Sequence, residues 1–180
     1  MRVTWYIKNT RANRLARFRK SLGMNSYNYD RFLTSTWNRC LQLIPYLENM
    51  NIECRVDSGN NLNTDIAVIM RWQDEKAYDL AVRLKDRKVI TVLDLCVNLF
   101  DKTGIFPGGY GVSKAVVDEV RKITPVVDAV ITGSEYIRKR AMEFNANAVY
   151  LPESIDYKHF IYKKNKEDFN RQIPRAIWSG

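Results

Sequence analysis

Residues 126–138 read VVDAVITGSEYIR, and this stretch decides the fold. The β-branched run up to Thr132 predicts a buried strand, and Gly133 ends it with a turn. Ser134 offers the hydroxyl of a helix N-cap, and Glu135 follows in the first turn, where the positive end of a helix favours a carboxylate. A strand that turns directly into a helix is the repeating unit of α/β proteins.

The same unit recurs along the chain. We expect further strands at residues 2–7, 52–56, 67–70, 89–95 and 148–151, and helices at 30–49, 74–85, 113–123 and 135–144. Pro45 should kink the first helix or mark its last regular turn. The runs at 67–70 and 89–95 lack polar alternation, as in strands covered on both faces. The sequence therefore predicts an α/β fold, a Rossmann-like parallel β-sheet with helices on both faces.

In such sheets ligands bind just past the carboxyl ends of the strands. The polar residues expected there are the candidate cleft residues: Lys8, Asn9, Arg11, Arg71, Asp94, Asn98, Ser134, Glu135 and Glu153. Asp94 ends a buried strand, where a carboxylate needs a partner, so it either orients a ligand hydroxyl or caps a neighbouring loop. Ser134 is alternatively a helix cap alone, and Glu153 alternatively lies in a solvated turn.

A glycine-rich loop, GIFPGGYG at residues 104–111, adds Gly108, Gly109 and Tyr110 to the candidates. It lacks the spacing of a phosphate-binding loop, because no Gly-Lys-Ser/Thr follows. It is either a ligand-binding loop or an ordinary surface loop.

The formal net charge of +9 is concentrated at the start, where residues 1–29 hold seven basic residues and no acidic one. Arg14, Arg17, Arg19 and Lys20 form a candidate surface for anionic membranes or phosphate-bearing ligands, on a basic amphipathic helix at 12–22 or in a solvated loop. A nucleic-acid-binding module is the rival interpretation of this charge. Against it, no helix-turn-helix, zinc-finger or RNP motif is visible.

Cysteine and histidine, the residues most often used in redox and metal sites, are few in this sequence. Cys40, Cys54 and Cys96 lie far apart, and His159 is the only histidine, which argues against a disulfide framework, a His-based triad and a metal site. No run of about 18 apolar residues is present to span a bilayer, and the start is charged too early for a signal peptide. We expect a cytoplasmic protein, peripheral at most at the cytoplasmic membrane face.

Several short motifs resemble those of a known protein family, and they occur in the same order along the chain. IPYLE at 44–48 precedes the strand 52–56, VLDLCVNLF occupies 92–100, VDAVITGSEYIR occupies 127–138, LPESID at 151–156 precedes His159 and Phe160, and IWSG ends the chain at 177–180. Together they resemble the amino-terminal domain of retaining GT-B glycosyltransferases of family 4. Departures are Cys96 and Val97, where many relatives have two aspartates, and Glu153-Ser154 in place of the common Asn-Gly.

The resemblance implies an acceptor-binding domain at residues 1–160, with a linker and the start of a donor-binding domain at 161–180. The whole enzyme would transfer a sugar from a nucleotide-sugar to a glycan, lipid or polymer acceptor. The second domain would hold the donor, so we expect no cofactor or metal here, no catalytic residue is assigned, and the 180-residue chain alone should transfer no sugar. A non-catalytic glycosyltransferase-like binding protein is the alternative.

Overall fold

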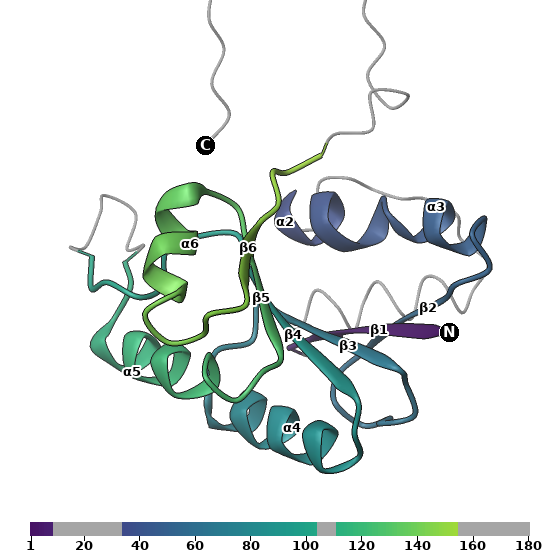
Figure 1. Cartoon of the computed structure of the whole chain (residues 1–180), viewed down its shortest axis with the longest axis horizontal. Coiled ribbons are helices and arrows are strands. Elements are labelled where there is room, and N and C mark those ends of the chain that lie inside the picture. Colours follow the sequence, from purple (N-terminus) through teal and green to yellow (C-terminus); the bar gives the residue numbers. More distant parts are fainter. Residues whose placement is uncertain (9–33, 104–110, 155–180) are drawn as a thin grey trace, which may run out of the picture.

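The computed structural model describes residues 1–8, 34–103 and 111–154. These residues form a six-stranded sheet with every pair of neighbours parallel, in the order β2-β1-β3-β4-β5-β6 (Figure 1). The strands are β1 (Arg2–Ile7), β2 (Glu53–Asp57), β3 (Ile66–Met70), β4 (Ile90–Leu95), β5 (Ala129–Thr132) and β6 (Ala148–Tyr150). The helical segments are α2 (Thr34–Thr36), η2 (Trp37–Leu41), α3 (Ile44–Glu48), α4 (Glu75–Asp86), α5 (Lys114–Ile123) and α6 (Glu135–Ala141). The predicted α/β class and Rossmann-like parallel sheet are confirmed.

The strand order decides which face each helix covers. The connections through α4, α5 and α6 all step in one direction across the sheet, so right-handed crossovers place these three helices on the same face (Figure 1). The connection from β1 to β2 steps the opposite way, which puts α2, η2 and α3 on the other face. The larger core, around Leu80, Leu93 and Val130, lies under α4–α6, and a smaller one, around Trp5 and Cys40, lies under the α2–α3 segment.

The helix expected at 30–49 is described from Thr34 onward and is irregular. A π-helical turn, η2, follows α2, and the Gln42 amide donates to the carbonyl of Trp37, five residues back, at 3.1 Å. The irregularity therefore precedes Pro45, which corrects the expected kink or end at this proline. Pro45 stands instead in the first turn of α3, where a missing N–H leaves no intrahelical bond unmade.

The strand expected from residue 126 begins later, at Ala129. The Val126 amide still donates to the carbonyl of Ile123 at 3.0 Å, which extends the turn at the end of α5. Asp128 then fixes the start of β5 against β4, since its Oδ2 accepts from both the amide and the hydroxyl of Thr91, each at 2.8 Å.

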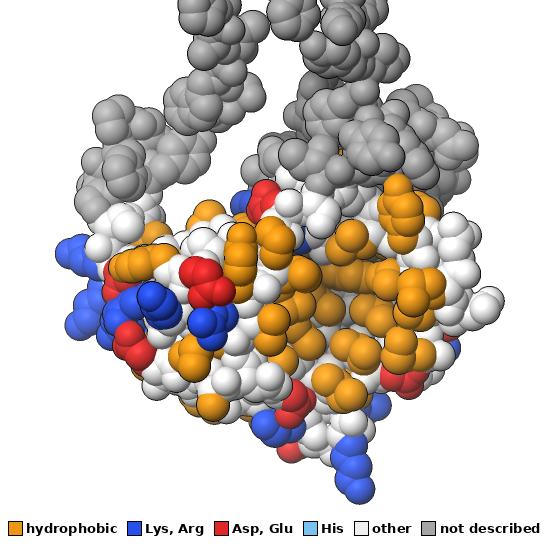
Figure 2. Space-filling model, turned by 45° about the horizontal axis from the view of Figure 1, so that its top comes forward, with side chains coloured by type: hydrophobic (Ala, Val, Ile, Leu, Met, Phe, Trp, Pro, Cys, Tyr) orange, Lys and Arg blue, Asp and Glu red, His pale blue; other side chains and the backbone are white. Residues whose placement is uncertain are grey.

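One half of the sheet face that bears α2–α3 is not covered by any described helix. The α2–α3 segment packs on β1 and β3 through Cys40, Leu41, Ile44 and Leu47. Farther along the same face, Ile90 and Val149 are 53% and 52% exposed, and Val92, Ala129 and Ile131 are half-buried. We call these five side chains of β4, β5 and β6 the open face. Figure 2, with the top of Figure 1 turned forward, shows hydrophobic side chains gathered in a hollow of the surface.

Candidate functional site

Asp94, at the carboxyl edge of β4, is buried against Arg39 of η2. The Arg39 Nε lies 2.7 Å from Asp94 Oδ1, and the two side chains are only 4% and 5% exposed. Arg39 Nη1 also donates to the carbonyl of Leu151, just past β6, at 3.2 Å. One arginine thus joins the ends of β4 and β6 to the helical segment on the second face.

The ion pair uses only half of its hydrogen-bonding capacity. Arg39 Nη2 is buried and has no partner among the described residues, and within them Arg39 Nε is the one donor to the Asp94 carboxylate. An arginine and a carboxylate commonly form two parallel bonds, so this pair makes one bond fewer than it could, and a buried donor stays unsatisfied. A hydroxyl group both accepts and donates and therefore matches such a gap.

Burial raises the pKa of Asp94 to about 6, although Arg39 acts to lower it. The negative charge of Glu153 also raises it. At neutral pH the carboxylate is therefore mostly ionised, yet a small change in its surroundings is enough to change its protonation. A carboxyl group whose pKa is shifted by burial and a specific charged partner is typical of a functional site.

Arg71, Ser35 and Cys96 extend the cluster along the carboxyl edge. Arg71 directly follows β3 with a φ of 54°, in the left-handed region that a bulky residue seldom adopts, and its guanidinium donates to the Ser35 hydroxyl. Burial raises the pKa of the Cys96 thiol. A hydrogen bond with Ser35 and the positive charges of Arg71 and Arg39 act to lower the same pKa. Two guanidinium groups therefore act on the same thiol, beside Asp94.

The segment after β6 forms the outer border of the cluster. Glu153 is exposed and accepts a long hydrogen bond of 3.4 Å from Asn38 Nδ2, while Gln42 Nε2 donates to the carbonyl of Ser154. Residues 151–154 thus lie along η2.

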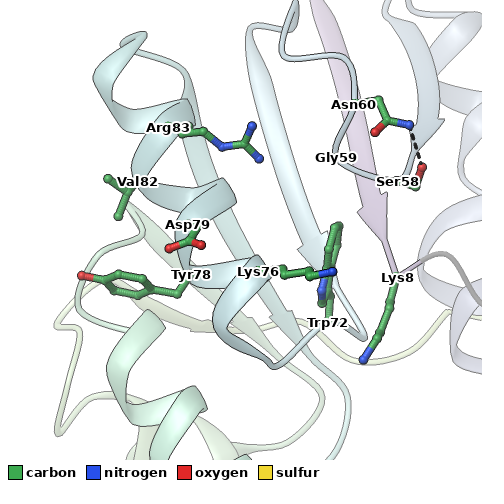
Figure 3. Close-up of a pocket in the computed structure, with 10 residues that line it drawn as sticks. All are labelled: Lys8, Ser58, Gly59, Asn60, Trp72, Lys76, Tyr78, Asp79, Val82 and Arg83. Carbon is green, nitrogen blue, oxygen red and sulfur yellow. Dashed lines mark hydrogen bonds between the residues drawn. The ribbon is translucent and has the colours of Figure 1, made fainter.

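A separate pocket of about 780 Å³ lies between helix α4 and the loop that follows β2 (Figure 3). Lys8, Lys76 and Arg83 give it a cationic lining around Trp72. Lys8 Nζ lies 2.8 Å from Asp74 Oδ2, and although burial alone raises the pKa of Asp74, hydrogen bonds from Lys8 and Trp72 hold it below the usual value. Asp74 also caps α4, so it serves the fold and holds the lining residues Lys8 and Trp72.

The structure brings Arg71, Asp94 and Glu153 of the predicted residues to one cluster, and it places Lys8 in the pocket. Ser134 caps α6, because its Oγ accepts from the Ile137 amide at 3.2 Å, and Glu135 pairs with Arg138 at 2.7 Å. Asn98 donates to Asp101 at 3.0 Å and accepts from the Phe100 amide at the same distance, which makes it a loop-ordering residue. The candidates outside the described residues are Asn9, Arg11, Arg14, Arg17, Arg19, Lys20, Gly108, Gly109 and Tyr110, together with the linker and domain start at 161–180.

Sequence reasoning missed Arg39, Ser35 and Asn38. The position of Asp94 at the end of a buried strand required a partner, but nothing in the sequence separates Arg39 from the other 28 basic residues. Arg39 lies 55 residues before Asp94. Lys76 and Arg83 of the pocket were missed for the same reason.

The fold and the cluster define the chain as an α/β protein with a Rossmann-like parallel sheet and a partly buried, charged site at its carboxyl edge. No protein-family model matches the chain, and no curated protein sequence matches it either. Within the part of the chain that the structure describes, no His, Cys, Asp or Glu cluster is arranged to hold a metal ion. In the same part, every helix is too short or too polar to cross a bilayer.

Proposed function

We propose that this chain is the acceptor-binding domain of a retaining glycosyltransferase, which transfers a sugar from a nucleotide-sugar to a hydroxyl group. The Arg39–Asp94 pair carries the proposal, because the buried Arg39 Nη2, which has no partner among the described residues, can donate to a hydroxyl group that in turn donates to the carboxylate. Its place at the carboxyl edge of a parallel sheet agrees with where such folds bind ligands.

In this proposal the acceptor hydroxyl accepts from Arg39 Nη2 and donates to Asp94 Oδ2. The bond to an ionised carboxylate increases the electron density on the hydroxyl oxygen, and it fixes the direction in which that oxygen points. Arg39 favours the ionised form of Asp94 that this role requires. Glu153, at the border of the cluster, would contact the remainder of the acceptor.

The nucleotide-sugar would bind to a second α/β domain, as the family resemblance implies, so this domain needs neither a cofactor nor a metal. We also propose a cytoplasmic location, as the sequence led us to expect, where an acceptor at the membrane face would lie within reach. Transfer of the sugar would require both domains.

The experiment is a titration of the isotope-labelled chain, followed by amide NMR, with methyl glycosides of several hexoses and with their nucleotide-sugars. We expect at least one glycoside to shift the amides of Asp94, Leu151 and Glu153, and nucleotide-sugars to shift them far less. Asp94→Asn should weaken glycoside binding at least about tenfold, since it removes a hydrogen bond to a charged acceptor. Asp118→Asn, on the exposed surface of α5, is the matched control.

Two outcomes would overturn the proposal. One is that no glycoside shifts these amides. The other is steeply salt-dependent binding of RNA or DNA in place of glycosides, which would favour the nucleic-acid-binding interpretation.

A further inference from the structure

The open face is an apolar surface that the topology leaves exposed. Because α4, α5 and α6 all lie on the opposite face, the half of this face over β4–β6 has no crossover helix of its own within the described residues. Ile90 and Val149 each expose more than half of their surface, and the strand register sets Val92 beside Ala129 and Ile131 beside Val149, so the apolar side chains are grouped. A contiguous exposed apolar patch on a protein surface commonly marks a binding site.

One end of the open face is polar. Along β4 the residues Ile90, Val92 and Asp94 alternate onto the same face, so the apolar row ends at the Arg39–Asp94 pair. On β6, Val149 belongs to the same face, and the carbonyl of Leu151, two residues later, accepts from Arg39. The surface therefore changes within a few residues from apolar to a hydroxyl-binding pair.

We propose that this site takes an amphiphilic acceptor, a single-chain lipid or alkyl glycoside, with its alkyl chain on the open face and its head-group hydroxyl between Arg39 and Asp94. The inference rests on the proposed function and narrows its acceptor from glycans, lipids and polymers to molecules with both an apolar and a hydroxyl-bearing end. The inference is supported by the order of residues along β4, where the apolar Ile90 and Val92 precede the charged Asp94. A wholly polar glycan would leave Ile90 and Val149 exposed to water.

The test compares three probes in the same amide NMR titration: octyl β-glucoside below its micelle concentration, methyl β-glucoside and n-hexane, which has no hydroxyl group. Octyl glucoside should bind at least about tenfold more tightly than methyl glucoside, because its seven additional CH₂ groups leave water. The added shifts should fall on Ile90, Val92, Ile131 and Val149. Asp94→Asn should weaken the binding of both glycosides and leave the binding of n-hexane unchanged.

Ile90→Gln and Val149→Gln should each remove most of the octyl-over-methyl preference, and both residues are exposed enough for the fold to tolerate the change. Val56→Gln is the matched control, since Val56 is a partly exposed valine on β2, three strands away from β4. It should leave the preference intact.

Equal affinities for octyl and methyl glucoside would overturn the amphiphile inference and leave the proposed function standing. Binding of n-hexane without either glycoside would overturn both. The inference also fails if the amides of β4 and β6 are as protected from hydrogen exchange as those of β3 and the hollow takes no probe, because the face is then covered by another part of this chain. Dimerisation that Ile90→Gln abolishes would show that a second copy covers it.

Discussion

Arg140 of α6 binds both carboxylate oxygens of Asp101, with Nη2 2.6 Å from Oδ1 and Nε 3.2 Å from Oδ2. Asn98 and Tyr136 donate to the same Oδ2, at 3.0 and 3.1 Å. The loop that leaves β4 beside Asp94 is thereby tied to the helix that follows β5. This pair lies outside the candidate site and fixes the loop at its border.

Asp101→Asn should lower stability most at neutral pH and least in acid. Arg140, followed by Asn98 and Tyr136, lowers the pKa of Asp101 to about 2 from an ordinary 3.8. The native state therefore binds fewer protons than the unfolded one, and the stabilisation is complete above about pH 4 and lost as the pH falls toward 2. Urea midpoints of the wild type and the variant should differ above pH 4 and converge near pH 2. A difference that is independent of pH would contradict the ionic role of Asp101.

Arg39→Met should destabilise the fold by about 3–5 kcal/mol, because it leaves a buried carboxylate without its partner. The double variant Arg39→Met/Asp94→Leu should recover much of that loss, since both charges are then absent. Urea unfolding of the two single variants and the double variant gives the coupling free energy. Simple additivity of the two single effects would show that the pair is not energetically coupled.

The contribution of Asp94 to stability should decrease as the pH rises. Its pKa is raised from 3.8 to about 6 in the folded protein, so between about pH 4 and 6 the native state binds more protons than the unfolded state. Relative to Asp94→Asn, the wild type should therefore be more stable at pH 4 than at pH 7. Carboxyl carbon NMR should show Asp94 titrating near pH 6, and in Arg39→Met at a higher pH, because Arg39 lowers this pKa. Titration near pH 4 in the wild type would contradict the burial argument.

Gly59→Ala should destabilise the protein by about 1–3 kcal/mol, because alanine meets two penalties there. The backbone has a φ of 93°, and an added Cβ would lie 2.9 Å from Cη2 of Trp72 in the wall of the pocket. Asn60→Ala, at the exposed neighbouring position, should change stability by less than about 0.5 kcal/mol. Equal urea midpoints for the two variants would show that the loop accommodates the methyl group by moving.

The sequence by itself determined the order and type of the elements and hence the class of the fold. Strand and helix periodicities are local, and so are the caps at Asp74 and Ser134, so they can be read within a few residues. It also identified Asp94 as a carboxylate that needs a partner. The local signal was weaker at element ends, as at β5, where turn bonds after α5 delay the strand to Ala129.

Only the tertiary structure decided which residues meet at the carboxyl edge. Arg39 and Asp94 are separated by 55 positions and belong to a helical segment and a strand that are far apart in the sequence, and no periodicity or motif encodes such a contact. The same holds for the open face, since apolar residues on β4 and β6 look like core until the direction of each crossover is known. Side-chain partners depend on how the strands are ordered in space, and that order results from the packing of the whole chain.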